Sequence, residues 1–490
     1  MVSLSELIAA AAILVSVYIV REWFLSQRDV HPLYLEEQSS IEPTRLPDES
    51  AIYRSNKLDL PDKLRIGLDI RYDHYKLRNG NLHDVWAIYA NTNGGNGKLS
   101  INDKTLSVGA LNYRVTKVSQ ALKLRRVSEV VIPFKTYQKL GFPLLAVILG
   151  AFVLSITVHI VSGDANIEEE DGILKLMLVS LVEQFVTLAF GGPLEPSNEL
   201  NEFPNAYDPA DDKGAFLKVS IKKLVFQTTV EYQVINAISA IAATLKHLPF
   251  NHELSNKDKL VIVQDTDAES MESVGNEIVK LLCGLTAACG EVAIVNDDVC
   301  DPLELKPTVM VLPQTYYLTL ALTNGAIIPG GSSWLLTLRE NLLSRGIMVT
   351  YGSKFAPLRL IYVHKPMGYG MHPLIEDSNQ ARSLFQSRIV VEHTWLTILG
   401  PVLATDFFDY RVLPVHVRSY GALSQSLEFK LVNVNDKMEG TIKTRGFTIG
   451  KLTNKKNGMV QQNSQTGGSD GFMPIPLPSK FGKDGVLYVL

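Results

Sequence analysis

The sequence has little cysteine and no excess of positive charge, and both shortages exclude classes of protein. Cys283, Cys289 and Cys300 are its only cysteines, and neither they nor its ten histidines show the spacing of a zinc site. Three scattered thiols fit a reducing compartment. The 47 Lys and Arg residues are outnumbered by 51 Asp and Glu residues, and no basic stripe indicates nucleic-acid binding. We therefore expect neither a metal site nor a nucleic-acid partner.

Long apolar runs are also scarce, and the first of them lies at the N-terminus. Leu7–Val20 reads LIAAAAILVSVYIV without a charged residue, and Met1–Leu25 together reach the ~20 residues that a hydrocarbon core requires. Arg21 and Arg28 follow the run, whereas the positive charge of a cleaved signal peptide, the alternative interpretation, precedes it. This order predicts a single-pass transmembrane anchor over residues 1–29, with the bulk of the chain facing the cytosol.

A second apolar run, Gly141–Val161, has two interpretations. It carries no formal charge besides the titratable His159, so that on its own it resembles a second membrane span. Its richness in β-branched residues favours a buried core element instead. Ile173–Gly191 is apolar too, but Lys175 and Glu183 indicate a core helix. If both runs were true spans, the chain would be a multi-span membrane protein.

The rest of the chain has the composition of a globular protein, with 46% apolar and 20% charged residues overall. Residues 30–60 are rich in Pro, Glu, Ser and Asp, which predicts an exposed linker. The domain that follows, residues 61–490, alternates strands and helices. Lys259–Gln264 is an apolar strand, Ser270–Ala288 has helical spacing, and Glu291–Val295 is again a strand. This alternation predicts an α/β domain with a mostly parallel sheet.

Three motifs in the C-terminal part resemble the AMP-forming acyl-CoA synthetases, the adenylate-forming ligases. Residues 398–411 read ILGPVLATDFFDYR, residues 427–436 read LEFKLVNVND, and residues 439–452 read EGTIKTRGFTIGKL. In that family a G-P-V-x-x-x-D-x-x-D-Y run leads to a V-K-L-V-D-V strand and then to a G-E-I-x-x-R-G-P-T strand pair. Weaker matches in the same order extend the resemblance over residues 61–490. It implies the large N-terminal domain of that fold, with layered sheets and helices and a small β subdomain.

The residues that would handle ATP in such an enzyme are substituted here. The family's phosphate loop, T-S-G-T-T-G-x-P-K-G, precedes a helix that we expect at Thr228–Ile235. The segment before it is GAFLKVSIKK, in which only Lys223 stands in place of the motif lysine. The carboxylate of Y-G-x-T-E, which would hold Mg²⁺ beside the α-phosphate, falls on Thr397. Glu392 lies five residues earlier and could replace it only after a register shift.

The remaining nucleotide motifs of the family are altered as well. The ribose-binding aspartate of T-G-D has its nearest counterpart in Asp470, and the adenine loop G-G-A-P corresponds to residues 364–366, His-Lys-Pro. Arg445 matches the family motif but stands at a structural turn. The chain ends at Leu490, which leaves no room for the small C-terminal domain that carries the adenylating lysine. The resemblance therefore predicts that this lid domain is absent.

Together these substitutions predict a pseudoenzyme with no catalytic residues and no cofactor. The expected function is scaffolding or sensing in lipid metabolism, at a membrane and with fatty acyl chains or lipid-metabolic enzymes as partners. The endoplasmic reticulum is the expected location, and peroxisomal and outer mitochondrial membranes are alternatives. The competing hypothesis is a divergent but active ATP-dependent long-chain fatty acid–CoA ligase. It would use ATP and Mg²⁺, with its site residues drawn from the following set: Lys223, Glu392, Thr397, Asp470 and Arg445.

Overall fold

The structure is a computed structural model of the 490-residue chain. The residues that it describes are 4–60, 63–92, 97–162, 172–190, 199–204, 207–223, 226–265, 271, 273–296, 298–324, 334–350, 352–368, 379–411, 413, 418–456, 459–461 and 470–490. For some of them, residues 4–10 and Lys223 included, the description covers the backbone and not the side chain.

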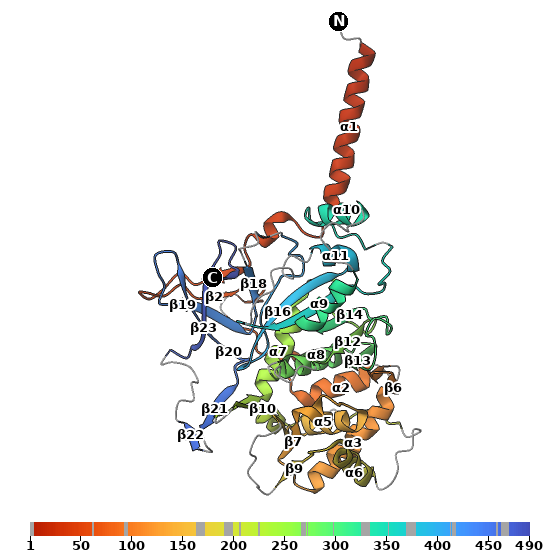
Figure 1. Ribbon diagram of the computed structural model, residues 1–490, viewed down its shortest axis with the longest axis vertical. Helices are drawn as coiled ribbons and strands as arrows, with labels where there is room; N and C mark the ends of the chain where they lie inside the picture. The colour runs from red at the N-terminus through yellow and green to blue at the C-terminus, as the bar shows by residue number, and fades with distance from the viewer. Residues whose placement is uncertain are drawn as a thin grey trace.

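Helix α1 (Leu4–Ser26) projects from the body of the molecule, with the N-terminus at its far end (Figure 1). Its 23 residues correspond to a length of about 35 Å. Apolar side chains in its second half are solvent-exposed, among them Ile13, Leu14 and Ile19 at 60–69%. Among the helices whose side chains are described, none combines the length and hydropathy needed to cross a membrane.

The body is organised around a 15-stranded mixed sheet. Its strands are, in spatial order, β1 (Ser39–Ile41), β2 (Tyr53–Ser55), β19 (Leu427–Val432), β20 (Glu439–Gly446), β23 (Met473–Phe481), β24 (Leu487–Val489), β18 (Arg418–Leu423), β17 (Ile398–Ala404), β16 (Arg388–Trp395), β15 (Leu360–Pro366), β14 (Val309–Pro313), β12 (Lys259–Val263), β13 (Glu291–Val295), β5 (Lys98–Ile101) and β6 (Lys104–Ser107). The run from β16 to β5 is parallel. Apolar residues dominate β12, β13 and β14 and the first half of β15, as expected where helices cover both faces.

A second sheet of seven strands lies beside the first. In spatial order it contains β22 (Met459–Gln461), β21 (Lys451–Lys456), β11 (Phe226–Gln233), β10 (Ala215–Lys223), β8 (Thr157–Val161), β7 (Glu129–Pro133) and β9 (Ile173–Lys175). A separate two-stranded ribbon joins β3 (Ile70–Asp73) and β4 (Lys76–Arg78). The seven-stranded sheet, like the first one, contains parallel strands, β7, β8 and β10, next to antiparallel ones.

Helices fill the space between and around the sheets. The described α-helices after α1 are α2 (Leu82–Thr92), α3 (Val108–Leu124), α4 (Phe134–Tyr137), α5 (Phe142–Val153), α6 (Val179–Phe190), α7 (Val234–His247), α8 (Val274–Thr286), α9 (Gln314–Thr323), α10 (Trp334–Leu343) and α11 (Asn379–Phe385), with 3₁₀ turns at Pro32–Leu35 and Pro209–Asp212. Figure 1 shows α2, α3, α5 and α6 gathered at the end of the body opposite α1, and α10 at the base of α1. The α/β architecture expected from the sequence is therefore present.

The two ambiguous apolar runs are parts of the body. Gly141–Val161 forms α5 and β8, whose residues are almost all buried, so the interpretation as a core element is confirmed. Ile173–Gly191 contains β9 and α6, and Val182, Phe185 and Val186 are the buried residues of α6. A residue with a side chain would be tight at Gly150, because an added Cβ would lie 3.1 Å from Val118. The close approach of α3 and α5 thus depends on this glycine.

The structure corrects two expectations about local structure. Residues 30–60 are not an exposed linker throughout, because β1 and β2 pair with each other and β2 pairs with β19. Thr228–Ile235 is not a helix. Its first six residues belong to strand β11, which pairs with β10, and α7 begins only at Val234. The alternating burial of Val230 and Tyr232 is the period of two that a strand with one buried face shows.

Candidate functional site

In open α/β sheets ligands bind beyond the carboxyl ends of the parallel strands, so we first considered the ends of β15 and β16. His364 lies near the end of β15 and is paired in register with Glu392 on β16. It is 2% exposed, and neither ring nitrogen has a hydrogen-bond partner among the described residues. Burial, with the positive charge of Lys280 as a second cause, lowers the pKa of His364 to about 3. The imidazole is therefore neutral and enclosed.

Glu392, the candidate metal ligand, forms an ion pair with Lys280 of α8 in the interior. Both side chains are only 2% exposed. The Lys280 ammonium also lies 3.5 Å from the centroid of the Tyr362 ring. Burial raises the pKa of Glu392, while the charge of Lys280 acts in the opposite direction. A carboxylate already neutralised by a buried cation is a poor ligand for a divalent ion, because releasing it would leave the lysine charge unpaired.

Thr397, at the position of the metal-binding carboxylate of the synthetases, lies in the turn between β16 and β17. It is 7% exposed, and its hydroxyl contacts the sulfur of Met473 at 3.2 Å. Its carbonyl oxygen accepts a hydrogen bond from the backbone N–H of Gly450. A neutral hydroxyl in contact with a thioether provides no charge for Mg²⁺, which prefers carboxylate and phosphate oxygens.

Arg445 lies on β20 in the antiparallel part of the large sheet, and Asp470 lies in the turn before β23. Asp470 Oδ2 is 2.8 Å from Lys430 Nζ, and this hydrogen bond is the main reason why the pKa of Asp470 is lowered to about 2. Arg445 forms an ion pair with Glu428, the residue opposite it on β19. Lys430 Nζ lies 4.6 Å and Arg445 Cζ lies 4.5 Å from the centroid of the Phe472 ring. Both candidates therefore have partners on β19.

Lys223 is the last residue of β10 and pairs with Phe226 of β11, so that only two positions separate the paired residues. Its side chain lies outside the described residues. The described residues in front of α7 thus pair as two antiparallel strands, whereas a phosphate cradle needs several consecutive free backbone N–H groups. The structure does not bring the five candidates together. Within the described ranges, no group of three or more His, Cys, Asp and Glu side chains could hold a metal ion.

One polar chain on the seven-stranded sheet was not found from the sequence. His159 on β8 links Glu129 Oε1 at 2.7 Å and Ser220 Oγ at 2.7 Å, and Ser220 Oγ is 2.6 Å from Thr229 Oγ1. Lys218 Nζ completes the chain at 2.7 Å from Glu129 Oε2. The arrangement has the order of a hydrolase triad, but Ser220 is 0% exposed. It therefore satisfies polar groups across four neighbouring strands; no substrate could reach the hydroxyl.

Comparisons with known proteins identify the architecture. No protein-family profile matches the sequence. The uncharacterized protein YHR045W of Saccharomyces cerevisiae is 25% identical, over 95% of this chain and 96% of its own. Among solved structures, MatB from Rhodopseudomonas palustris superposes with a TM-score of 0.56 at 12% identity, over 84% of this chain and 78% of its own. For o-succinylbenzoate CoA synthetase (MenE) from Bacillus subtilis the TM-score is 0.53 at 11% identity, over 83% of this chain and 77% of its own. For VinN bound to L-aspartate the TM-score is 0.54 at 12% identity, over 87% of this chain and 99% of its own.

This chain has the adenylate-forming ligase fold. The resemblance read from motif order is confirmed at the level of architecture, although the identities to these structures are too low to carry activity. In this adenylate-forming ligase fold His364 and Glu392, near the carboxyl ends of β15 and β16, are buried, and Glu392 is paired with Lys280 of α8.

The opposite, amino-terminal end of β16 holds the joint between α1 and the body. Asp29, just after α1, accepts two hydrogen bonds of 3.0 Å from Arg388 Nη2, and the Tyr410 hydroxyl donates to Asp29 Oδ2 at 2.6 Å. The backbone N–H of Asp29 also donates to the carbonyl of Gly346 at 3.0 Å. These contacts fix the end of α1 beside the residues that follow α10.

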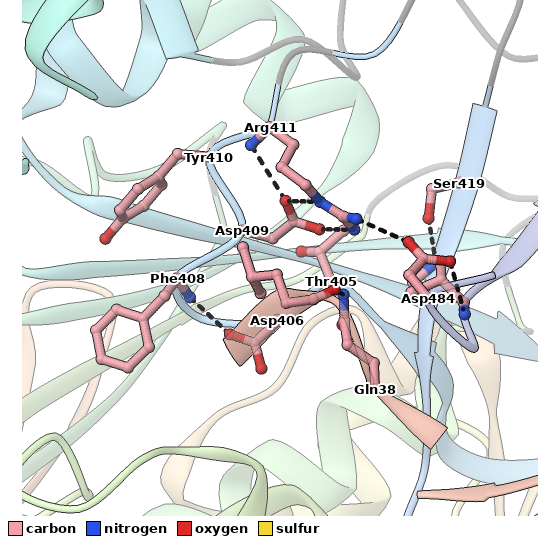
Figure 2. Close-up of polar contacts among 12 residues, drawn as sticks. Gln38, Thr405, Asp406, Phe408, Asp409, Tyr410, Arg411, Ser419 and Asp484 are labelled. Carbon is pink, nitrogen blue, oxygen red and sulfur yellow. Dashed lines mark hydrogen bonds and ion pairs between the residues drawn. The ribbon is translucent and has the colours of Figure 1, made fainter. Parts of the chain in front are cut away.

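A cavity of about 640 Å³ opens beside this joint, a size typical of small-ligand sites. Its lining residues come from four separate segments: Arg28, Val30, Leu35, Glu36, Leu343, Ser344, Arg345, Gly346, Phe408, Tyr410, Arg411, Lys483 and Asp484. Figure 2 shows Arg411 held between Asp409 and Asp484. Both Asp409 oxygens accept from Arg411, at 2.9 and 2.7 Å, and Asp484 Oδ2 lies 2.7 Å away. Sequence reasoning missed this cavity.

Proposed function

We propose that this protein is a membrane-anchored, acyl-CoA-synthetase-like protein that does not activate fatty acids and instead acts in lipid metabolism as a scaffold or sensor. The observation that carries the proposal is the buried ion pair between Lys280 and Glu392. It occupies Glu392, the carboxylate considered as a replacement for the metal ligand of the synthetases. The antiparallel pairing of β10 with β11 supports it, because the resemblance puts the phosphate loop of the synthetases at this position in the sequence.

The proposal of a membrane anchor is supported by the N-terminal sequence as a whole. Leu7–Val20 contains no charged residue, and α1 leaves the body without packing along it (Figure 1). At its base, α10 exposes Trp334 at 73% and Leu338 at 48%. Aromatic and apolar side chains at this level suit the interface between headgroups and water. We place the bulk of the chain in the cytosol and the anchor in the endoplasmic reticulum membrane.

Calorimetry with Mg·ATP tests the absence of adenylation. The full chain in a non-ionic detergent is titrated to millimolar nucleotide, beside MatB from Rhodopseudomonas palustris as a positive control. We expect no saturable heat from this protein. Saturable binding that is lost in Glu392→Gln, and retained in the surface variant Glu253→Gln, would contradict the proposal. That result would favour the divergent but active long-chain fatty acid–CoA ligase, and acyl-adenylate formation would be assayed next.

Membrane topology is tested separately. We expect the chain to stay in the membrane pellet after alkaline carbonate extraction, and a glycosylation sequon placed before Ser3 to be modified. A sequon inserted near residue 165 should remain unmodified, because we place that region in the cytosol. If alkaline carbonate releases the chain from the membrane, the proposed anchor is wrong. The conclusion from the calorimetry with Mg·ATP would not change.

A further inference from the structure

The cavity at the base of α1 differs from the carboxyl-end region in having charges that are not neutralised. Four basic and two acidic residues line it. Arg411 and Asp484 neutralise each other across 2.7 Å. The other three cations, Arg28, Arg345 and Lys483, form no ion pair with any described residue. Only Glu36 opposes them.

Arg28 carries the strongest sign of a missing partner. Its Nε is buried, yet it has no hydrogen-bond partner among the described residues. A buried donor without an acceptor costs about 1–3 kcal/mol, and an anion that draws the Arg28 side chain into the cavity would recover this cost. The Arg28 backbone directly precedes the Asp29 joint, and its Cγ lies close to Gly346, 3.8 Å from the position that an added Cβ would take.

The floor of the same cavity is apolar. Leu343 is 1% exposed, Phe408 is 7% exposed and Leu35 is 9% exposed, and Val30 is half-buried beside them. A free inorganic anion would use the cations but leave this apolar surface against water. A ligand with both an anionic group and a hydrocarbon chain would use both parts, because apolar contact contributes roughly 25 cal/mol per Å² removed from water.

We propose that this cavity binds the head of an anionic amphiphile, a carboxylate or phosphate ester with an attached hydrocarbon chain, taken from the surrounding membrane. The source of the ligand rests on the proposed membrane anchor. The anionic head meets Arg28, Arg345 and Lys483, and the first part of the chain lies against Leu343 and Phe408. The site is at the amino-terminal end of β16 and is distinct from the carboxyl ends, where nucleotide motifs of this fold were sought.

The location of the cavity fits a ligand that arrives from a bilayer. It lies between the end of α1 and the residues that end α10. The two helices expose apolar side chains, among them Trp23 of α1 and Trp334 of α10. An amphiphile in the outer part of a membrane would therefore meet the cavity without crossing open water. Because Asp29, Arg388 and Tyr410 fix the joint, the backbone of the adjoining Arg28 is in position before the ligand arrives, which lowers the entropic cost of binding.

Photo-crosslinking of the full chain in phosphatidylcholine vesicles tests the proposal. Three probes are used at equal mole fraction: diazirine-labelled oleate, a diazirine-labelled oleoyl lysophosphatidate, and diazirine-labelled oleyl alcohol as an uncharged chain. Excess inorganic phosphate serves as an unlabelled competitor without a chain. Labelled peptides are mapped by mass spectrometry. We expect the anionic probes to label the segments around residues 28–36 and 343–346, and the stronger of the two identifies the head group.

Charge variants measure the electrostatic part. We expect Arg28→Gln to weaken capture of the anionic probes about tenfold, which corresponds to about 1.4 kcal/mol, and Glu36→Gln to strengthen it. Lys104→Gln, which removes an exposed lysine on β6 at the far end of the body (Figure 1), should change nothing. Ser344→Trp keeps every cation but fills the mouth of the cavity, and it should also reduce labelling. Thermal unfolding of each variant verifies that it is folded.

Several outcomes would overturn the proposal. Equal labelling by oleyl alcohol would show general contact with the bilayer and no site for an anion. Displacement of both probes by inorganic phosphate alone would indicate a phosphate site without an apolar part. Unchanged capture in both Arg28→Gln and Ser344→Trp would place the ligand elsewhere. If the chain fails to associate with vesicles, the anchor fails, whereas oleate added to detergent-solubilised protein still reports on the cavity.

Discussion

Removing Lys280 tests the buried ion pair on which the proposed loss of activity rests. We consider Lys280→Met, which keeps the length and apolar stem of the side chain but removes the charge that neutralises Glu392. Both partners are 2% exposed, so the carboxylate of the variant has no route to bulk water. Breaking a buried ion pair by removing one partner costs about 3–5 kcal/mol. For 490 residues, the unfolding entropy is roughly 1 kcal/mol per kelvin, which predicts a midpoint lower by about 3–5 °C.

The cost should depend on pH, and its sign follows from the pKa of Glu392. Burial already raises this pKa in the presence of Lys280, and without the lysine nothing offsets the burial, so the pKa of the variant rises further. A carboxyl group whose folded pKa lies above its unfolded pKa binds more protons when folded. Its unfavourable contribution is therefore small near pH 5 and grows as the pH rises, by up to about 1.4 kcal/mol per unit.

Thermal unfolding of the full chain in detergent, at pH 5, 6, 7 and 8, measures both effects. Lys259→Met is the matched control, because Lys259 pairs with Glu291 at 2.9 Å with both side chains 20–23% exposed and should cost at most about 1 kcal/mol. The double variant Lys280→Met/Glu392→Leu should recover stability relative to Lys280→Met alone. The reasoning is refuted if the loss is the same at pH 5 and pH 8, or if the double variant is no more stable than the single one.

Three further predictions concern other parts of the molecule. Although burial acts to raise it, hydrogen bonds from its two basic partners lower the pKa of Glu129 to about 2. Its contribution to stability is therefore present above the unfolded pKa near 4.5 and is lost as the pH falls towards 2. In thermal melts Glu129→Gln should be most destabilising at pH 7, less so at pH 3 and nearly neutral only near pH 2. Gly446→Ala should lower the free energy of unfolding by about 3 kcal/mol, because the new Cβ would lie 2.1 Å from a backbone carbonyl oxygen. The control Gly214→Ala is also at positive φ but has open space around it, and it should cost only about 1 kcal/mol. Equal losses of stability in the two variants would mean that the contact is irrelevant. Asp29→Asn should loosen the joint at the end of α1, seen as at least tenfold faster amide exchange at residues 27–30, with no change at α3; unchanged exchange would show that the ion pair with Arg388 does not hold the joint.

Motif order and local pattern were enough to predict much of the architecture. The apolar strands Lys259–Val263 and Glu291–Val295 were recognised because their β-branched residues and short length are typical of a parallel sheet. The turn at Asn102, with a φ of +53°, and the helix cap at Ser107, whose hydroxyl accepts a hydrogen bond from the Ala110 N–H, are local in the same way. These features depend on neighbours in sequence, so the sequence contains their causes.

The misassigned helix at Thr228–Ile235 shows where resemblance misleads. A match to a helical motif placed the start of the helix six residues early, against the β-branched run Thr228, Thr229, Val230, which favours a strand. The hairpin partner that decides the matter, β10, supplies the pairing of every residue from Phe226 to Gln233. Local propensity was the better guide here, because strand pairing reinforced it.

The candidate site could not be assembled from the sequence, because its decisive contacts join distant positions. Lys280 and Glu392 are 112 residues apart, and no spacing rule connects a lysine in a helix with a carboxylate in a strand. Glu392 was considered as a shifted metal ligand since its partner was unknown. The cavity is assembled from four segments between residues 28 and 484, and scattered arginines and lysines in a sequence look like ordinary surface charge.

The two ends of the parallel strands differ in how far their charges are neutralised, and this difference connects the proposals. At the carboxyl end, Glu392 is paired with Lys280, and farther along the same sheet Asp470 is paired with Lys430, so little free charge remains to attract a nucleotide or a metal. At the amino-terminal end, Arg28 keeps a buried Nε without a partner next to an apolar floor. Recognition of a charged ligand requires charge that the protein has not already neutralised. A protein with this distribution is better suited to bind an anionic ligand beside α1 than to perform chemistry at the position where the fold suggests it.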